Sequence, residues 1–323
     1  VLGVEIPADQ VEIILQHLGL QPEKTAEGFR VTSPSFRFDI EIEADLIEEI
    51  GRVYGYENIP DDYTSGRLKM LALPETKRPR FAVYNEMAAR GYREVVSYAF
   101  VDEQWEQDFA ANTHPIRLQN PLAAQYAVMR STLIGGLVEV LQNNLNRKQN
   151  RVRVFEIARV FSKDSADQFI QDERIGGLGY GSVLPEQWGE KTRNVDFYDM
   201  KADVESLLKN KDVSFVKTEH PALHPGRAAN IVSDGQVVGF VGELHPKWLQ
   251  KYDLPQAPLV FEIDMAAVLE REKTRYQAVS KFQPVRRDLA FVVPEATTFE
   301  QLQAALTTVC EPMLREITLF DVY

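Results

Sequence analysis

The sequence has a single cysteine, Cys310, among its 323 residues. One thiol excludes an internal disulfide and a cysteine-based zinc site, and this scarcity is typical of proteins from a reducing compartment. No apolar run approaches the roughly 20 residues that a helix needs to cross a bilayer. The N-terminus also lacks the basic and then apolar layout of a signal peptide. We therefore expect a cytoplasmic protein, with Cys310 on the core face of an apolar helix.

Positive charge is also scarce, since 36 Lys and Arg stand against 48 Asp and Glu and the formal net charge is −12. Such a chain repels phosphate backbones, so any contact with nucleic acid needs a local basic patch. The hydrophobic fraction of 44% and the length favour more than one domain with a buried core. There is no initiator Met and the closing "EITLFDVY" has the pattern of a strand. We therefore expect a fragment of a longer protein.

The first third of the chain predicts two amphipathic helices joined by extended segments. Residues 8–20 place apolar side chains at helical spacing and end at Gly19, and residues 41–54 repeat that spacing after an alternating stretch. The stretch "LPETKRP", rich in proline and charge, is typical of a linker. We place a domain boundary there, near residue 74.

From Arg80 onward the patterns alternate between helix and strand. "RFAVYNEMAARGY" predicts a short helix, and "REVVSYAFV" and "RVRVFEIARVF" predict strands. Residues 130–147 carry a leucine at every fourth position, which predicts a helix, and the pair Gly135-Gly136 would let another backbone approach it closely. Asp234-Gly235 predicts the turn of a β-hairpin. Helices interrupted by antiparallel pairs indicate an α+β fold.

The last part of the chain, after about residue 272, predicts a strand, a helix and a strand. This order is half of a split β-α-β unit. Unpaired strand edges in half a unit invite pairing with another chain. We therefore expect residues 285–323 to dock on a neighbouring copy or to be poorly ordered.

The helix predicted at 41–54 has an apolar arc, including Ile42 and Val53, that should be buried. Its opposite arc holds Glu41, Asp45, Glu48, Glu49 and Arg52. A solvated polar face is the ordinary explanation of such an arc. Like charges at three- and four-residue spacing repel, however, and Arg52 is the only cation within the arc. Asp39, just before the helix, could cap it or turn toward Asp45.

Oxygen ligands at this density suit Mg²⁺ better than zinc. Because Mg²⁺ usually takes only one or two protein carboxylates, the cluster implies a site shared with another chain.

Other candidate sites have ordinary explanations. "GGLGYGS", residues 176–182, lacks the lysine of a phosphate loop and the spacing of a dinucleotide loop, so we expect a strand whose glycines admit a neighbouring backbone. His220 and His224 have metal-like spacing, but no third ligand follows them. Arg227 in "HPGRAAN" can hold an anion or lie in a surface turn. The residues support no Ser-His-Asp or Cys-His arrangement.

Several strings resemble the β-subunit family of bacterial phenylalanyl-tRNA synthetases. "RFDIEIEADLIEEIGRVYGYENIP" resembles the signature of that family's B5 domain. The strings that follow in the family's order are "GYREVVSYAF", "NPL" with "MRSTLIGGLVEVLQNNLNR", "RVFEIARVF", "HPGRAANIVSDGQVVGFVGELHP" and "SKFQPVRRDLAFVV". Together they span essentially the whole chain.

The resemblance implies three regions. Residues 1–74 would form a winged-helix-like B5 domain, and residues 75–272 a non-catalytic class II synthetase-like module with an antiparallel sheet and flanking helices. Residues 273–323 would form the N-terminal half of a ferredoxin-like anticodon-binding domain. In that family the α subunit of an α₂β₂ tetramer uses ATP to join phenylalanine to tRNA(Phe), and an upstream editing domain precedes B5. The resemblance therefore implies no catalytic residue and no bound ATP in this chain, in which "VFEIARVF" and "HPGRAAN" only faintly echo the class II motifs.

The resemblance also implies sites and contacts. The family's magnesium site, shared with the α subunit, falls on Asp39, Asp45, Glu48 and Glu49. Arg286 and Arg287 would face tRNA. The helix at 130–147 and the sheet would pack on the α subunit, which makes the chain a scaffold. The fragment alone would self-associate through its incomplete last domain.

An alternative outside that family is a self-standing, Mg²⁺-dependent module that binds nucleic acid. Residues 35–60 count against it, because their basic residues are only Arg37 and Arg52.

Overall fold

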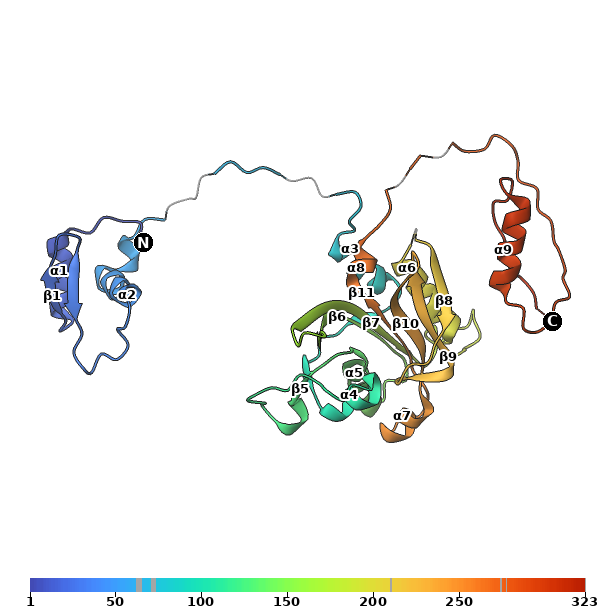
Figure 1. Ribbon diagram of the computed structural model, residues 1–323, viewed down its shortest axis with the longest axis horizontal. Coiled ribbons are helices and arrows are strands. Elements are labelled where there is room, and N and C mark those ends of the chain that lie inside the picture. The colour runs from blue at the N-terminus through green and yellow to red at the C-terminus, as the bar shows by residue number, and fades with distance from the viewer. Residues whose placement is uncertain (62–65, 71–73, 210, 274, 277, 323) are drawn as a thin grey trace. The chain divides into compact units, whose positions relative to one another are not determined.

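The computed structural model describes residues 1–61, 66–70, 74–209, 211–273, 275–276 and 278–322. The chain divides into two compact units, Val1–Leu73 and Pro74–Tyr323, coloured in chain order in Figure 1. No helix among the described residues is long and apolar enough to span a membrane.

The N-terminal unit consists of a helix, a hairpin and a second helix. Its elements are α1 (Ala8–His17), β1 (Gln21–Lys24), β2 (Phe29–Thr32), α2 (Glu43–Tyr54) and the short 3₁₀ helix η1 (Tyr56–Asn58). The core of this unit is small, and Ile14, Leu15 and Leu20 are its buried large side chains. Both predicted helices are present.

The apolar arc of α2 is less buried than its pattern predicted. Ile42 is 64% exposed and Val53 is 43% exposed, so the prediction of a fully buried arc is wrong at both positions. The arc is wider than the small surface that α1 offers for packing, and its edges therefore remain in solvent.

The unit that begins at Pro74 is built on a seven-stranded sheet with the order β3-β6-β7-β11-β10-β9-β8. The strands are β3 (Arg93–Glu94), β6 (Val152–Lys163), β7 (Phe169–Tyr180), β8 (Val213–Lys217), β9 (Leu223–Ser233), β10 (Gln236–Leu244) and β11 (Leu259–Asp264). Every neighbouring pair is antiparallel except β3 with β6. The α+β class is confirmed, and the expected antiparallel sheet is a mixed one because of β3.

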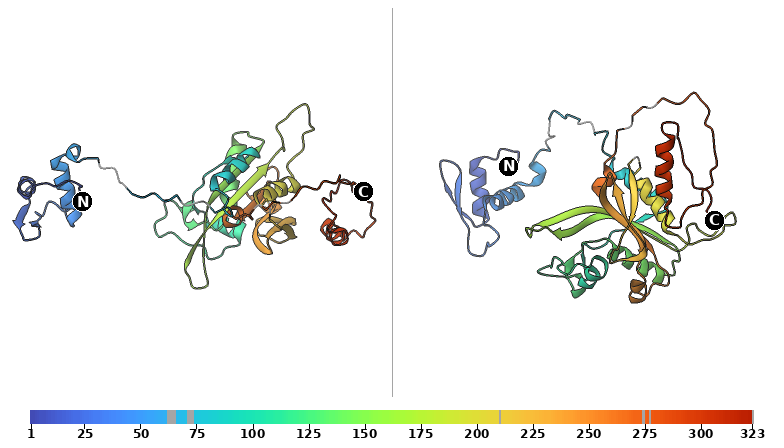
Figure 2. Two further views of the ribbon diagram at one scale, coloured as in Figure 1. Left: turned by 90° about the horizontal axis from the view of Figure 1, so that it is seen from above. Right: turned by 45° about the vertical axis from the view of Figure 1, so that its right-hand side comes forward.

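Two strongly patterned segments fold as the sequence predicted. All of "RVRVFEIARVF" except its first residue lies in β6, which pairs along its whole length with β7. Figure 2 shows this long hairpin extending from the sheet. Asp234 and Gly235 connect β9 to β10 with φ angles of 52° and 79°, which is the backbone that a two-residue hairpin loop of this kind requires.

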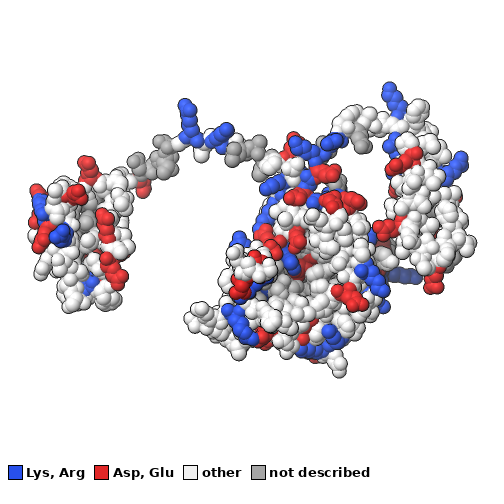
Figure 3. Space-filling view, viewed as in Figure 1, with Lys and Arg blue, Asp and Glu red and all other residues white. Residues whose placement is uncertain are grey.

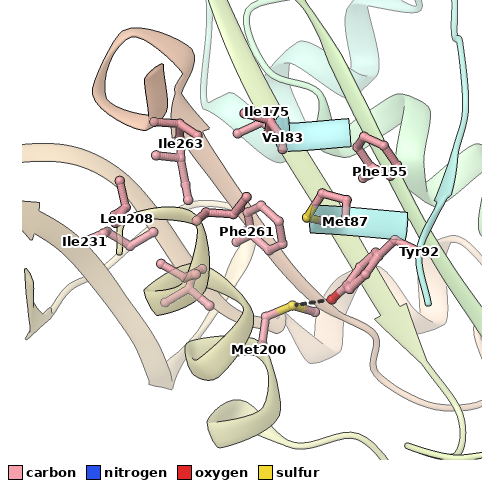
Figure 4. Packing of buried hydrophobic residues seen from close by; sticks show 14 of the residues in the cluster. Val83, Met87, Tyr92, Phe155, Ile175, Met200, Leu208, Ile231, Phe261 and Ile263 are labelled. Atoms are coloured by element: carbon pink, nitrogen blue, oxygen red, sulfur yellow. Dashed lines mark hydrogen bonds between the residues drawn. The ribbon is translucent and has the colours of Figure 1, made fainter. Parts of the chain in front are cut away.

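Successive side chains of the strands point to opposite faces of the sheet, and each face has its own apolar core. On one face, Phe155 and Phe261 pack with α3 (Arg80–Ala89), α6 (Phe197–Leu207) and α8 (Met265–Leu269). Figure 4 shows Phe261 in this core, near Met200 and Tyr92.

On the other face, Val154 and Val260 pack with α4 (Glu103–Ala110), α5 (Ile134–Asn146) and α7 (Pro246–Lys251). Figure 1 shows the two groups of helices on opposite sides of the strands.

The glycines in β7 and α5 make room for side chains and not for another backbone. A Cβ on Gly177 would overlap the ring of Phe261, and one on Gly135 would lie 2.6 Å from Cε3 of Trp105. The strand expected over residues 176–182 is confirmed up to Tyr180. The expected close backbone approach is wrong at Gly176, Gly177 and Gly179, where side chains occupy the space. It is confirmed at Gly181, where a Cβ would overlap the backbone carbonyl oxygen of Asn150.

The segment "REVVSYAFV" is not one strand. It forms β3 and, after a break, β4 (Phe100–Val101), which pairs with β5 (Val128–Met129) in a separate two-stranded sheet. In the break, the backbone N–H and the hydroxyl of Ser97 donate to the carboxylate of Glu156, at 3.1 and 2.7 Å. These bonds to a buried side chain replace the ladder bonds of a strand.

The described residues of the C-terminal part include helix α9 (Phe299–Cys310), which is capped by the hydroxyl of Thr298. The predicted flanking strands are absent from the described residues, where Val285 and Phe320 are 77% and 64% exposed. A strand needs a hydrogen-bonded neighbour, and no described segment pairs with these residues. The core position expected for Cys310 is also wrong, because this thiol is partly exposed.

Candidate functional site

Of the four carboxylates predicted to bind magnesium, Asp39 precedes α2, Asp45 lies in its first turn, and Glu48 and Glu49 lie near its middle. Asp45 has a structural role there, because its Oδ2 atom accepts the backbone N–H groups of Glu41 and Ile42 at 2.8 and 2.9 Å. These bonds satisfy free donors at the helix start. Donation from Ile42 and then Glu41 lowers the pKa of Asp45.

Asp39 and Glu49 are paired with arginines. Nη2 of Arg37 lies 2.7 Å from Oδ2 of Asp39 and 3.2 Å from Oε2 of Glu49. Arg52 adds a second cation 3.0 Å from the same oxygen of Glu49. Hydrogen bonds from Arg37 lower the pKa of Asp39, and those from Arg52 and then Arg37 lower the pKa of Glu49.

The residues of the helical arc alone suggested that the acidic cluster lacks positive charge. In the structure, Arg37 and Arg52 supply that charge. Arg37 is outside the helix and reaches it through a turn, so the spacing of residues within the helix could not reveal it. The turn is closed by the hydroxyl of Ser33, which donates to the carbonyl of Arg37 at 3.2 Å.

As arranged, these side chains do not fit a magnesium ion. In the ranges that the structure describes, no group of three or more His, Cys, Asp or Glu side chains is placed to hold a metal. Glu48 is exposed, Asp45 caps the helix, and Asp39 and Glu49 face Arg37. A metal at Asp39 and Glu49 would require Arg37 to leave both. Magnesium binding by the four residues stays a prediction.

His220 and His224 each close a turn of their own by accepting a backbone N–H from two residues further on. Nδ1 of His220 accepts the N–H of Ala222 at 3.2 Å, and its ring stacks on Phe240 with centroids 4.0 Å apart. Nδ1 of His224 accepts the N–H of Gly226 at 3.0 Å. Burial lowers the pKa of His220 to about 4.

The arginines of the candidate anion and tRNA sites lie on the surface. Arg227 is paired with Glu243 at 2.6 Å. Nε of Arg286 lies 3.5 Å from Oδ1 of Asp288, and both Arg286 and Arg287 are exposed. A role of Arg286 and Arg287 toward tRNA stays a prediction.

The N-terminal half of α5 is buried inside its own unit, from Ile134 to Val138. Just before it, Arg130 forms a buried ion pair with Glu156 at 3.1 Å, in which both side chains are about 95% shielded. Glu262 accepts the hydroxyl of Thr132 at 2.6 Å and the N–H of Leu133 at 2.8 Å. Glu156 of β6 and Glu262 of β11 therefore hold the backbone of residues 130–133, which leads into α5.

We did not predict these buried acids. A signal was present, since Glu156 and Glu262 each stand between apolar residues of a strand, and a buried charge needs a partner.

Over the described residues, apolar cores cover both faces of the sheet. Two cavities, of about 130 and 280 Å³, lie beside the sheet, whereas sites for small ligands usually measure about 300 to 1,000 Å³. On the face shown in Figure 3, acidic and basic side chains are interspersed over the sheet-containing body. Each face of the sheet is therefore packed against other elements of its own unit.

Three family models match the chain in succession. The tRNA synthetase B5 domain matches residues 1–56, the phenylalanyl tRNA synthetase beta chain CLM domain matches residues 59–265, and the ferredoxin-fold anticodon binding domain matches residues 280–323. Our boundaries at residues 74 and 272 stay predictions.

Relatives named phenylalanine--tRNA ligase beta subunit match over all 323 residues. The identity is 84% for Neisseria meningitidis serogroup B, 82% for Neisseria gonorrhoeae and 55% for Chromobacterium violaceum. In each case the match covers 100% of this chain and 41% of the relative, so the chain spans less than half the length of these proteins.

Among solved structures, pyrrolysyl-tRNA synthetase from Desulfitobacterium hafniense matches at 8% identity, over 59% of this chain and 68% of that one. Its TM-score of 0.43 is too low to support an argument. Because the CLM model covers most of the sequence, from residue 59 to residue 265, the chain belongs to the phenylalanyl-tRNA synthetase beta chain family.

Proposed function

We propose that this chain is part of the β subunit of a phenylalanine–tRNA ligase and serves as the scaffold of its catalytic α subunit. The whole enzyme would use ATP to join phenylalanine to tRNA(Phe). The observation that carries this proposal is the 84% identity over all 323 residues to a protein named as that β subunit.

A structural and not a chemical role is supported by the filled sheet. A class II catalytic site would need a sheet face with free arginines for ATP phosphates. Here the arginines of the two candidate motifs have partners, Arg159 with Gln171 at 3.2 Å and Arg227 with Glu243 at 2.6 Å. Both faces of the sheet carry apolar cores. We therefore place the chemistry in the α subunit.

The proposed partners are the α subunit, in an α₂β₂ assembly, and tRNA(Phe). Exposed basic side chains at Arg286 and Arg287 would meet tRNA phosphates. A magnesium ion at Asp39, Asp45, Glu48 and Glu49 would be completed by the α subunit. This magnesium proposal requires Arg37 to move away from Asp39 and Glu49 when the partner arrives.

Co-expression with the matching α subunit tests the scaffold role. We expect this chain to co-elute with the α subunit in size-exclusion chromatography, as full-length β does. A matched control carries Leu137→Asp, which places a charge in the fully buried face of α5 and should abolish co-elution by disrupting the scaffold. Separate elution of the unaltered chain, under conditions where full-length β binds, would count against the proposal.

A further inference from the structure

Three aromatic rings gather beside the short β4–β5 sheet, outside both apolar cores. The ring centroids of Tyr98 and Phe100 are 5.4 Å apart, and Tyr126 of η2 (Ala124–Tyr126) lies 5.2 Å from Tyr98 and 6.0 Å from Phe100. Tyr98 is 60% exposed. Rings clustered in this way normally close a core, but here their cluster borders an open cavity.

The cavity of about 130 Å³ is lined by these rings together with Trp105 and the acids Asp102 and Glu139. Oδ1 of Asp102 caps α4 by accepting the N–H of Gln104 at 2.8 Å. Across the described residues, no hydrogen bond or ion pair engages the carboxylate of Glu139, which is partly buried on α5. A partly shielded carboxylate beside aromatic faces lacks the cation that both groups favour.

Buried hydrogen bonds of Ser97 hold the residues that line this cavity in place. Ser97, which also lines it, donates its hydroxyl to Glu156 at 2.7 Å and accepts from Arg130 at 2.8 Å. Gly136 admits the Ser97 side chain against α5. The buried Arg130–Glu156 pair therefore fixes the loop that carries Tyr98 relative to the helix that carries Glu139.

We propose that this cavity, the Tyr98–Glu139 pocket, receives a cationic side chain, an arginine or a lysine, from a partner polypeptide. The ring faces would contact the cation by cation–π attraction and Glu139 would form the ion pair. A guanidinium or ammonium group is small enough for a cavity of about 130 Å³.

Two features favour a polypeptide as the source of the cation. The residues that flank the pocket in sequence expose large apolar side chains, Val96 at 87% and Leu122 at 82%, and apolar surface around a polar contact is typical of protein interfaces. The two carboxylates also repel phosphate, which disfavours RNA. The identity of the partner, the α subunit, rests on the proposed function, whereas the cation preference of the pocket does not.

The test begins with the 323-residue chain alone and with small probes. Blocked arginine and blocked lysine are titrated while the indole signal of Trp105 is followed by NMR, and blocked citrulline is the uncharged control. We expect saturable shifts with the two cations and none with citrulline. Glu139→Gln and Tyr98→Leu should each weaken probe binding about fivefold or more. Glu205→Gln, on the opposite side of the sheet, should leave it unchanged.

The same titration of the complex with the α subunit identifies the source. If a side chain of the partner fills the pocket, the probes no longer shift the Trp105 signal once the complex has formed. Unchanged probe binding in a complex that has demonstrably formed would overturn the partner proposal and indicate a free small cation. Equal binding of citrulline, or no binding of any probe by the chain alone, would overturn the cation site itself. Failure of the complex to form would instead count against the proposed function.

Discussion

Replacement of His220 gives the sharpest test of how the β9 region is packed. The ring of His220 stacks on Phe240 and its Nδ1 atom accepts the N–H of Ala222, so the neutral form is the one that the fold accommodates. Burial, reinforced by the nearby Arg174 and opposed by Glu262, lowers its pKa from 6.5 to about 4. His220 is therefore protonated near pH 6.5 in the unfolded chain, but only near pH 4 in the folded chain.

The sign and size of the effect follow from this difference. At pH 7.5 both states are neutral and the free energy of unfolding is unaffected by His220. As the pH falls to 4.5, the unfolded state gains the proton first and becomes relatively more stable. With a shift of about 2.5 pKa units at about 1.4 kcal/mol per unit, most of the penalty has developed by that pH, about 2.5 kcal/mol.

The assay is urea denaturation of the wild type and of His220→Phe, which keeps the stacked ring but cannot be protonated. The variant should lose about 2.5 kcal/mol less than the wild type between pH 7.5 and 4.5. Carboxylates that titrate in this range cancel in the comparison. The exposed His114, replaced by Phe, serves as the control and should follow the wild type. Parallel curves for the wild type and His220→Phe would refute the reasoning that His220 is held neutral.

Three further changes test other contacts. Gly177→Ala forces a methyl group against Phe261 and should lower the free energy of unfolding by about 1–3 kcal/mol. The control Gly189→Ala lies in open space and should leave the free energy of unfolding unchanged. Equal free energies of unfolding for the two variants would contradict the packing described. Glu156→Ala leaves the buried charge of Arg130 without its carboxylate partner and should lower the free energy of unfolding by about 3–5 kcal/mol in thermal or urea unfolding. Most of this loss should be recovered when Arg130 is also replaced by Met. Arg37→Gln removes the cation paired with Asp39 and one of the two cations paired with Glu49, so calorimetry should find tighter Mg²⁺ binding than in the wild type. Unchanged affinity would mean that Arg37 does not occupy the site.

The sequence predicted well the elements that local chemistry determines. The Asp234-Gly235 hairpin follows from two positive φ angles that those residues tolerate, and β6 follows from its long run of β-branched and aromatic residues. Helix α2 follows from its apolar spacing, although its start is set by the carboxylate of Asp45. In each case the signal lies within a few neighbouring residues.

Contacts between distant residues were not predictable in the same way. Arg37 forms an ion pair with Glu49, which lies 12 positions away in the sequence. Glu156 accepts a hydrogen bond from Ser97, which lies 59 positions away. A helical or strand pattern covers only neighbouring residues and therefore could not reveal either partner. The strands predicted on either side of α9 have the right composition, but composition does not supply the neighbouring strand that would complete their hydrogen bonds.

The central claim is that this chain supplies structure while the α subunit supplies the chemistry. The most direct measurement is the rate of phenylalanine activation, followed by ATP–pyrophosphate exchange, in the α subunit assembled with full-length β that carries Arg159→Gln and Arg227→Gln. Both arginines have partners on the surface of the sheet, and the account predicts a rate within about twofold of the wild type. A loss of about 100-fold or more, the size expected when a group that stabilises transition-state charge is removed, would contradict it.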